Sequence, residues 1–359
     1  MVVKIGIIGL GTVGSGVVKT LKAFKQVEIV KIAVRNIKKP RNIQGLDTSI
    51  LTDNAFDIVN NPDIQIVVEV VGGIEPAFEL IKTALKNGKH VVTANKELLA
   101  KHGEELFSLA QAQNKVILYE AAIAGGIPII MPIKTILAGN KITKIAAILN
   151  GTTNYILTKM DNDGATYADV LAEAQKLGYA EANPTGDVEG FDAAYKLATL
   201  ATIAFKQRIR IEHIYREGIS KIKAEDMAYA NEFGYKIKLI ALAQLDERGR
   251  ADVRVHPMLV KKSKSLAHID YVTNAVMLSG TPVGEIMFSG PGAGEFPTAS
   301  SVVGDILVIT NEIDKTDYPL PMMRCSHEKD ANIMKITDTI NKYYLSINAN
   351  NNAGVIGLI

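Results

Sequence analysis

The first third of the chain alternates between short apolar runs and longer amphipathic runs. The short runs are apolar almost throughout, as in strands buried on both faces, and the longer runs repeat apolar residues at helical spacing. The predicted strands are 3–8, 27–34, 64–73 with its glycine loop, 90–95 and 115–122, and the predicted helices are 13–24, 76–89 and 96–114. This alternation predicts an α/β fold with a doubly wound parallel sheet, in which ligands bind beyond the carboxyl ends of the strands.

A glycine motif follows the first predicted strand and opens the first predicted helix. In GLGTVG, Gly9 makes a tight turn, Gly11 lets the backbone approach a pyrophosphate, and Gly14 lets the helix pack on the strand. The motif has little weight alone, but an ordinary glycine-rich turn would not require this order of strand, turn and helix. We therefore expect a Rossmann-type nucleotide-binding domain, with Thr12 and Val13 also contributing to the cofactor site.

The end of the second predicted strand favours one form of the cofactor. Enzymes that use NAD commonly carry an Asp or Glu there, whereas this chain has Arg35, followed closely by Lys38, Lys39 and Arg41. A guanidinium can stack on adenine and pair with a 2′-phosphate, which favours NADP. A basic loop can also be plain solvated surface, so NAD stays possible.

Glycines and polar residues recur where the later predicted strands end. They are Gly72, Gly73, Thr93, Asn95, Lys96 and Glu120. Because the carboxyl ends of parallel strands share one edge of a sheet, we expect Gly72 and Thr93 to contact the cofactor. Lys96 directly follows a buried strand, which indicates a site residue rather than a surface lysine.

Composition and charge narrow the class of protein. The 359 residues, 47% hydrophobic and 22% charged, suit two domains with substantial cores. The net charge of +2 comes from residues spread along the chain, so we expect small-molecule partners rather than nucleic acid or a membrane. The single cysteine, Cys325, permits no internal disulfide and fits a reducing cytoplasm. The longest apolar stretch, residues 116–133, is interrupted by Glu120, glycines and prolines, and does not predict a transmembrane helix.

A charged pair stands out in the largely apolar helix predicted from Phe191 to Phe205. Asp192 and Lys196 are four residues apart, which places them on one face of that helix. The ordinary explanation is an acid–base pair on a solvated face, which contributes a few tenths of a kcal/mol. The surrounding motifs favour a functional role.

Six motifs in this order resemble homoserine dehydrogenase. They are GLGTVGSGV, VVTANKELLA, YEAAIAGGIP, ILNGTTNYIL, LGYAEANPTGDVEGFDAAYKLA and PGAGEFPTASSVVGDI. The resemblance runs from the first residues to about residue 310. It implies NAD- or NADP-dependent interconversion of L-homoserine and L-aspartate 4-semialdehyde, on the route to threonine, isoleucine and methionine.

The resemblance also implies roles for individual residues. Lys196 matches the acid–base lysine, and Lys96 matches a second lysine at the nicotinamide end. Glu181 and Asp192 match residues that hold the substrate, whose ammonium group needs a carboxylate partner. Thr152 is expected to line the substrate pocket.

The chemistry of alcohol oxidation agrees with these roles. Removing a hydride from a primary alcohol requires loss of the hydroxyl proton, and the reverse reaction needs a proton donor, so one acid–base group serves both directions. Free lysine titrates near about 10.4, so its pKa should be lowered. Lys96 would lower the pKa of Lys196 by like-charge repulsion, and Asp192 would raise it. The sequence does not decide which of these two effects on the pKa of Lys196 is larger.

The resemblance also implies a monovalent metal ion, bound by a loop of the third motif. The implied ligands, suited to Na⁺, are the Glu120 carboxylate and the backbone carbonyls of Ile123, Gly125 and Ile127. Two positions depart from the family pattern: Asn183 stands where an Asp is usual, and Ala122 where a Ser is common. These departures concern hydrogen bonding around the substrate and the metal.

The expected domains follow from the same comparison. Residues 1–133 form the nucleotide-binding domain, completed by about 290–320, where Gly292 approaches the cofactor. Residues 134–289 form an α+β substrate and dimerisation domain, which implies a homodimer or a higher homo-oligomer.

The end of the chain changes character. Residues 321–342 are polar, contain prolines and are expected to be a linker. Residues 343–359 resemble the opening of an ACT domain, an amino-acid-binding regulatory module, cut within the module. Such a fragment cannot bury a core of its own, so we expect threonine feedback to be absent or impaired.

Two other functions compete with this interpretation. Aspartate semialdehyde dehydrogenase needs a cysteine nucleophile, and Cys325 lies in the predicted linker, far from the motifs. A non-catalytic NAD(P) sensor would have no reason to keep Lys96, Lys196, Asp192 and Glu181 together.

Overall fold

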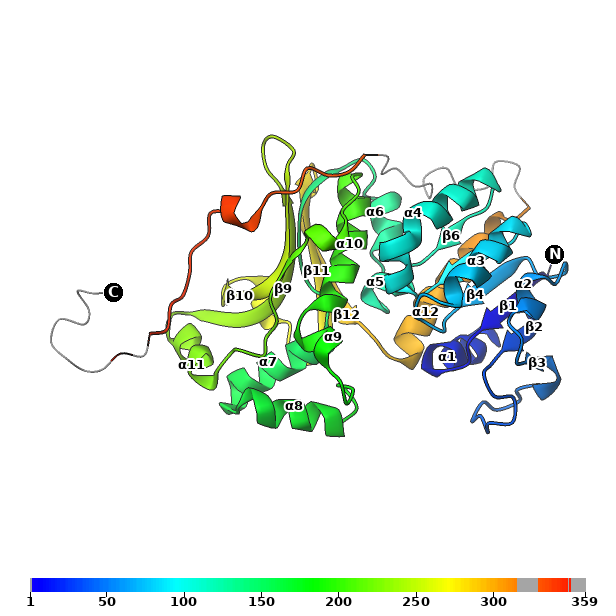
Figure 1. The fold of residues 1–359 in the computed structure, drawn as a ribbon, viewed down its shortest axis with the longest axis horizontal. Helices are drawn as coiled ribbons and strands as arrows, with labels where there is room; N and C mark the ends of the chain where they lie inside the picture. The colour runs from blue at the N-terminus through cyan, green and yellow to red at the C-terminus, as the bar shows by residue number, and fades with distance from the viewer. Residues whose placement is uncertain (1, 315–328, 348, 350–359) are drawn as a thin grey trace.

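The computed structural model describes residues 2–314, 329–347 and 349, which form two units side by side along the long axis of the molecule (Figure 1). The first unit contains a six-stranded sheet in the order β3-β2-β1-β4-β5-β6, and all its strand pairs are parallel. Its strands are β1 (Val3–Ile8), β2 (Val27–Ala33), β3 (Leu51–Thr52), β4 (Ile66–Glu69), β5 (His90–Thr93) and β6 (Ile117–Leu118). The order reverses between β1 and β4, so the predicted doubly wound sheet is confirmed.

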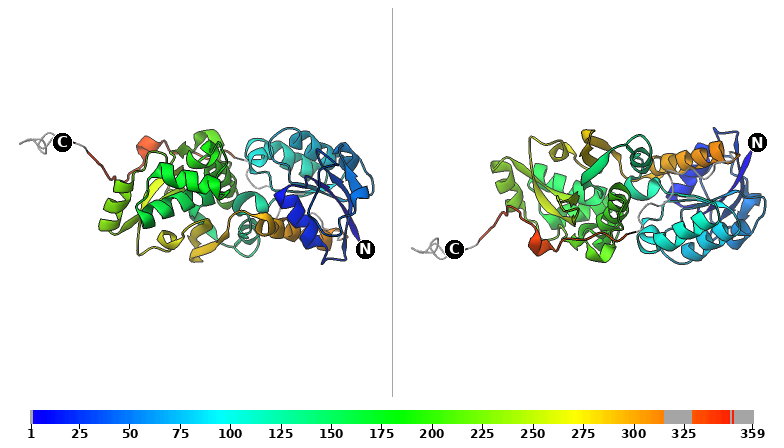
Figure 2. Two further views of the ribbon diagram at one scale, coloured as in Figure 1. Left: turned by 90° about the horizontal axis from the view of Figure 1, so that it is seen from below. Right: turned by 90° about the horizontal axis from the view of Figure 1, so that it is seen from above.

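Helices cover both faces of this sheet (Figure 2). They are α1 (Thr12–Leu21), α2 (Phe56–Val59), α3 (Ala77–Lys86), α4 (Lys96–Ala112) and α12 (Glu295–Glu312). Successive residues of a strand enter different cores: Val67 belongs to the core that includes α3 and α4, and Val68 to the core that includes α1 and α12. The central strands β4 and β5 are buried at every residue, which explains why they are apolar almost throughout.

One predicted strand is mostly wrong. Of residues 115–122 only β6 pairs in the sheet, and the short helix α5 (Ala121–Ala124) follows it and ends at Gly125, whose φ is +59°. A short apolar run does not distinguish a buried strand from a buried helix, and here the chain turns away towards the second unit. The two-residue strand β3 has no apolar run that would predict it.

The second unit is built on a sheet in the order β12-β11-β7-β9-β10-β8, antiparallel except for β10 with β8. Its strands are β7 (Lys141–Ile148), β8 (Tyr215–Arg216), β9 (Tyr235–Leu245), β10 (Ala251–Lys261), β11 (Thr273–Thr281) and β12 (Gly284–Pro291). Its helices are α7 (Gly151–Asp163), α8 (Tyr167–Lys176), α9 (Thr185–Val188), α10 (Phe191–Phe205) and α11 (Ala224–Glu232). The expected second domain of mixed helix and strand is confirmed.

Helix α10 lies between the second sheet and the first unit (Figure 1). It packs on β7 and β9 on one side, and on α4, α5 and α6 (Ile130–Lys134) on the other. A helix enclosed in this way is apolar around most of its circumference, which explains its sequence. Any charged side chain on it is therefore brought into the boundary between the two units.

Two of the chain segments that cross between the units touch through their backbones. The Gly126 N–H donates to the carbonyl of Pro291 at 3.1 Å. A Cβ atom at Gly125 would collide with the carbonyl of Gly292, so only glycine permits this contact. The outgoing and returning segments thus form one compact connection.

The C-terminal residues of the described chain pack on the second unit. The Arg208 N–H donates to the carbonyl of Lys329 at 2.9 Å, and the Ala251 N–H donates to that of Asn332 at 2.8 Å. Buried Arg254 donates through Nη2 to Asn341 Oδ1 at 2.8 Å. The described part of the predicted linker is therefore attached along the sheet, whereas residues 321–328 lie outside the described residues.

The predicted ACT segment, 343–359, lies mostly outside the described residues. Residues 343–347 and 349 form no strand, so this assignment stays a prediction. Across residues 2–314, 329–347 and 349, no helix has both the length and the apolar character that crossing a membrane requires.

Close packing of α1 on α12 predicts unequal effects of adding one methyl group. A Cβ at Gly16 of α1 would lie 2.6 Å from the Glu295 carbonyl oxygen and 2.9 Å from Ala299 Cβ. We expect Gly16→Ala to destabilise the protein by about 1–3 kcal/mol through overpacking, visible as a lower thermal midpoint. Gly304 of α12 is the matched control, since a Cβ there meets nothing within 4 Å. Gly304→Ala should raise stability by up to about 1 kcal/mol, and equal effects of the two changes would contradict the packing argument.

Candidate active site

The buried pair on α10 is the centre of the site. Asp192 and Lys196 are only 8% and 9% exposed. Lys196 Nζ donates to Asp192 Oδ2 at 2.8 Å and to the Leu149 carbonyl at 2.7 Å. Burial excludes the ordinary explanation of a solvated surface pair, because a buried charge must be paired and hydrogen-bonded.

A second lysine reaches the same carboxylate from the other unit. Lys96 is the first residue of α4, directly beyond β5, and its Nζ forms an ion pair with Asp192 Oδ1. The Asp192 carboxylate therefore connects two ammonium groups that come from different units. The structure thus brings Lys96, Asp192 and Lys196 together.

Asn150 and Asp187 complete this cluster, and the sequence did not single them out. Asn150 Nδ2 donates to Asp187 Oδ1 at 2.7 Å and to Asp192 Oδ2 at 2.9 Å. Both residues lie within motifs noted above. From the sequence alone, an Asn before a helix is expected to be an ordinary cap, and Asp187 is expected to be part of a turn. Only the tertiary contact reveals their shared partner.

Burial and the neighbouring charges shift the protonation of the cluster. Burial lowers the pKa of Lys196; the Asp192 carboxylate opposes that shift without reversing it, and the Lys96 ammonium adds to it. Burial also disfavours ionised Asp192, but the two ammonium groups outweigh it and hold the pKa of Asp192 well below its usual range. For Lys96, burial is outweighed by Asp192, so its pKa is raised. The balance of burial and neighbouring charge therefore favours a more acidic Lys196.

A buried network fixes the loop next to Lys96. Glu69, at the end of β4, accepts the backbone N–H groups of Val71 and Gly72 and the hydroxyl of Thr93, the last at 2.6 Å. Asn95 caps α4 by accepting from the Leu98 N–H at 3.2 Å. The Thr93 hydroxyl therefore helps to order this loop. The sequence does not predict this role of Glu69, because the residue lies at the end of an apolar run and no nearby motif marks it.

The glycine motif has the geometry that its sequence predicts. Gly9 has φ +107°, and a Cβ there would lie 2.9 Å from the Val70 carbonyl. A Cβ at Gly14 would collide with the Gly9 carbonyl, whereas Gly11 has open space around it. Thr12 begins α1, so its first turn faces this opening. These features suit a pyrophosphate at a helix N-terminus.

The two arginines of the basic loop after β2 differ in their hydrogen-bond partners. Arg35 is exposed. Arg41 instead donates to the carbonyls of Asn36, Ile37 and Lys39, and so closes the loop on itself. Arg35 is therefore the arginine that is available to a ligand.

The loop that carries Glu181 lies near the start of α7. Thr152 Oγ1 donates to the Tyr179 carbonyl at 2.6 Å, and Gln175 Nε2 donates to the Glu181 carbonyl at 3.1 Å. The Glu181 side chain is exposed, and among the described residues its carboxylate forms no ion pair. The structure therefore does not join Glu181 to the lysine cluster directly.

The Glu120 carboxylate, a predicted metal ligand, is held by backbone hydrogen bonds. It accepts the backbone N–H groups of Ile129, Ile130 and Met131 at the start of α6, the last two at 2.7 Å. The Gly125 carbonyl, another predicted ligand, accepts the Ser301 hydroxyl at 2.6 Å. Both the Glu120 carboxylate and the Gly125 carbonyl therefore accept hydrogen bonds. These bonds help to fix the chain where it crosses between the units. Within the described ranges, no three His, Cys, Asp or Glu side chains are grouped as for a metal.

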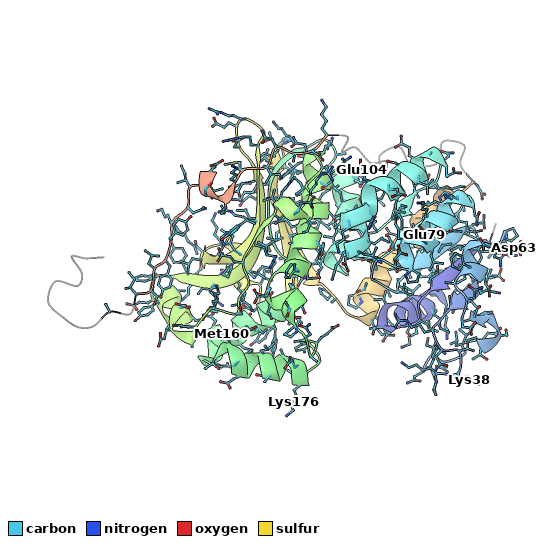
Figure 3. The ribbon with its side chains drawn as sticks, in the orientation of Figure 1. Lys38, Asp63, Glu79, Glu104, Met160 and Lys176 are labelled. Atoms are coloured by element: carbon cyan, nitrogen blue, oxygen red, sulfur yellow. The ribbon has the colours of Figure 1, made fainter. Side chains whose placement is uncertain are left out.

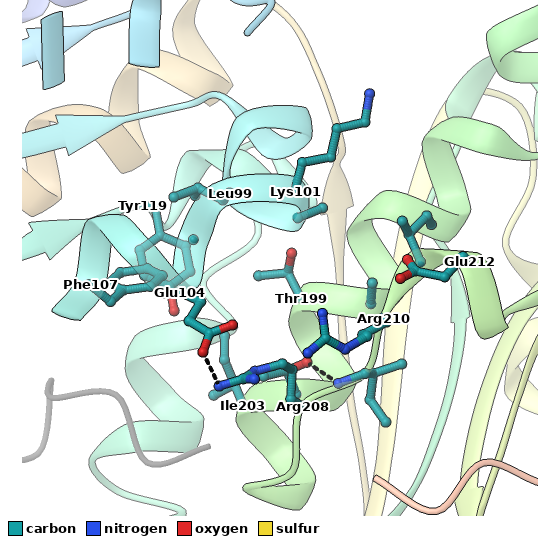
Figure 4. Close-up of a pocket in the computed structure, with 16 residues that line it drawn as sticks. Leu99, Lys101, Glu104, Phe107, Tyr119, Thr199, Ile203, Arg208, Arg210 and Glu212 are labelled. Carbon is teal, nitrogen blue, oxygen red and sulfur yellow. Dashed lines mark hydrogen bonds and ion pairs between the residues drawn. The ribbon is translucent and has the colours of Figure 1, made fainter. Parts of the chain in front are cut away.

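A pocket lies farther along α4 and α10, away from the lysine cluster (Figure 4). Its lining includes Leu99, Phe107 and Thr199, and the Glu104 carboxylate pairs across it with Arg208 Nη2 at 2.8 Å. Its walls come from both units. None of the predicted site residues lines this pocket, so it is separate from the candidate active site.

Comparison with known proteins identifies the family. The profile of homoserine dehydrogenase matches residues 128–307, and that of the homoserine dehydrogenase NAD binding domain matches residues 9–120. Homoserine dehydrogenase of Synechocystis sp. is 44% identical over 370 residues, which cover 99% of this chain and 85% of that protein.

Solved structures agree with this result. A homoserine dehydrogenase from Thiobacillus denitrificans superposes with a TM-score of 0.88 at 44% identity, covering 93% of this chain and 80% of that one. A hyperthermophilic archaeal homoserine dehydrogenase in complex with NADPH gives a TM-score of 0.74 at 29% identity, covering 87% and 98%. The chain therefore belongs to the homoserine dehydrogenase family, NAD(P)-dependent oxidoreductases that interconvert L-homoserine and L-aspartate 4-semialdehyde in the biosynthesis of threonine, isoleucine and methionine.

Proposed function

We propose that Lys196 is the general acid and base of this reaction, with Lys96 as the second lysine at the nicotinamide end. The observation that carries the proposal is a buried lysine with a lowered pKa, next to an ammonium group supplied by the nucleotide-binding unit. A lowered pKa makes a larger fraction of Lys196 neutral at a given pH, as a base requires.

The proton path follows from this assignment. The nicotinamide cofactor accepts or supplies the hydride when bound. Neutral Lys196 takes the hydroxyl proton of L-homoserine on Nζ, and its ammonium form returns a proton to the carbonyl oxygen of the semialdehyde. The Leu149 carbonyl and Asp192 hold Nζ in place through their hydrogen bonds of 2.7 and 2.8 Å.

We assign the substrate's ammonium group to Glu181 and Asp192. Asp192 already pairs with two lysines, so Glu181, with its exposed carboxylate, supplies the more available charge. Thr152 keeps the Glu181 loop against α7 through its bond to Tyr179, and in this proposal it lines the substrate pocket. This arrangement would recognise an amino alcohol rather than a plain alcohol.

The cofactor is assigned to the switch point of the first sheet. The supporting residues are Gly9, Gly11, Thr12, Val13, Gly14, Gly72, Lys96 and Gly292. NADP is the preferred form in this proposal, because exposed Arg35 follows the second strand. The archaeal relative whose structure contains NADPH is consistent with it.

The metal ion, the oligomeric state, the location and the feedback regulation are the remaining assignments. A Na⁺ ion at Glu120, Ile123, Gly125 and Ile127 would share the Glu120 carboxylate and the Gly125 carbonyl with the hydrogen-bond donors that these oxygens already have, and no step is assigned to it. A homodimer would use the second sheet, whose edge strand β12 exposes Met287. The cytoplasmic location and the loss of threonine feedback stay predictions.

Loss of the proposed base should slow the chemical step. We expect Lys196→Ala to lower kcat by about two to four orders of magnitude, the usual contribution of acid–base catalysis, with cofactor affinity little changed. The measurement is nicotinamide reduction with L-homoserine and no phosphate. Lys176→Ala is the control, because Lys176 ends α8 on the outer surface (Figure 3). Activity of Lys196→Ala within a few fold of wild type would remove Lys196 from this role.

Reversal of charge after β2 should change the cofactor preference. We expect Arg35→Asp to shift the ratio of kcat/KM values from NADP towards NAD, because the carboxylate repels a 2′-phosphate and accepts the ribose hydroxyls. Arg41→Asp tests the same charge change at an arginine committed to its own loop. An unchanged ratio in Arg35→Asp would show that Arg35 does not contact the phosphate.

Neutralising Glu181 should weaken recognition of the ammonium group. A charge-assisted hydrogen bond contributes roughly 1.5–3 kcal/mol, so Glu181→Gln should lower kcat/KM for L-homoserine about ten- to a hundred-fold. Binding of NADP alone should be nearly unaffected. The control substrate is 4-hydroxybutyrate, which lacks the ammonium and should be processed equally poorly by both proteins. An equal loss on both substrates would show that Glu181 acts in another way.

A further inference from the structure

We propose that Asn150 is a positioning residue that keeps Lys196 more acidic by sharing the Asp192 carboxylate with it. The inference rests on the proposed role of Lys196 and concerns a residue between β7 and α7 that touches neither lysine in the described contacts. Asn150 is 5% exposed. Its side-chain amide makes hydrogen bonds on both sides.

The orientation of the amide is fixed by its partners. Asn150 Oδ1 accepts the Thr153 N–H at 2.8 Å and the Thr153 hydroxyl at 3.0 Å, which caps α7. The NH₂ group then points to Asp187 and Asp192, one hydrogen for each carboxylate. A flipped amide would place its oxygen against two carboxylates and leave the helix cap without an acceptor, so only this orientation satisfies every group.

The amide separates two acidic groups that would otherwise repel each other. Burial raises the pKa of Asp187 and the nearby Asp192 carboxylate adds to this, whereas the hydrogen bond from Asn150 opposes it. Both carboxylates can therefore stay ionised beside one amide. An ordinary cap by Ser, Thr or Asp would supply the acceptor for α7 but no NH₂ for the acids.

The same bond changes what Lys196 experiences. Asp192 Oδ2 accepts both Lys196 Nζ, at 2.8 Å, and Asn150 Nδ2, at 2.9 Å. A second donor withdraws negative charge from the oxygen that stabilises the Lys196 ammonium, so the ammonium form is favoured less. The other charged groups that face Lys196 are Lys96 of α4, which disfavours the ammonium, and Asp187 of α9, which favours it. Removing the NH₂ group should therefore raise the pKa of Lys196.

The test measures how kcat depends on pH in both directions of the reaction. Asn150→Ser keeps a cap acceptor and loses the NH₂ group, and Asn150→Asp keeps the shape and the acceptor but adds a carboxylate. We expect the limb on which homoserine oxidation rises with pH to move upward by about 0.5–1 pH unit in Asn150→Ser, and further in Asn150→Asp. The limb on which semialdehyde reduction falls with pH should move upward with it.

A matched cap variant separates this role from a structural one. Thr166 caps α8 by accepting from the Asp169 N–H at 3.3 Å and lies outside the cluster. Thr166→Ala should lower the thermal midpoint and leave both pH limbs in place. If the Asn150 variants also lose stability or rate with unmoved limbs, Asn150 is only a cap and the proposal is overturned. Should Asn150→Asp not fold, Asn150→Ser alone decides.

Lys196→Ala distinguishes failure of this inference from failure of the proposed function. If the residual activity of Lys196→Ala keeps the wild-type limb, the limb does not report Lys196, and both proposals fail. If the limb disappears in Lys196→Ala but stays in place in Asn150→Ser, the acid–base role stands and the positioning role of Asn150 is refuted.

Discussion

The buried carboxylate of Asp192 is the interaction on which the site depends. It holds one lysine from each unit of the protein, and Asn150 adds a third donor. With Asp187 nearby, the cluster contains two cations and two anions, so the buried charge is balanced. Burying charges is costly unless they are paired, and removal of one partner leaves an uncompensated charge. Balance also changes with catalysis: a neutral Lys196 leaves one net negative charge, and the ammonium group of the substrate would restore neutrality.

This balance requires the two units to sit in a defined relation. Helix α10 is enclosed between the second sheet and α4, α5 and α6, which fixes Asp192 relative to the second unit. Lys96 reaches it only because α4 begins directly beyond β5 at the edge of the first sheet. The touching glycines, Gly125 and Gly292, keep the two crossings that contain them close together. The apolar packing of α10 and the ion pair of Lys96 are therefore parts of one boundary.

The sequence predicts those features that depend on local patterns. The glycine motif, strands β1, β2, β4 and β5, and the shared face of Asp192 and Lys196 follow from short apolar runs, from helical spacing of about 3.6 residues and from turn chemistry. The roles of Asn150, Asp187 and Glu69 do not, because each depends on partners far away in the chain. Glu120 shows the same limit: its residue type suggests a metal ligand, but the sequence does not show that its carboxylate accepts the backbone N–H groups at the start of α6.

Helix starts explain why polar residues gather at the site. Asn95 caps α4 and Asn150 caps α7, and in each case the cap is one residue or one hydrogen bond away from a group of the cluster. Asp192 lies in the first turn of α10, where the helix dipole favours a carboxylate. Lys96 occupies the first position of α4, where the dipole disfavours an ammonium, so its ion pair with Asp192 offsets a local cost. The side-chain oxygens of both Asn residues thus accept hydrogen bonds at the start of a helix, while their NH₂ groups donate to neighbouring groups of the loop or the cluster. Neither a serine nor an aspartate cap can do both.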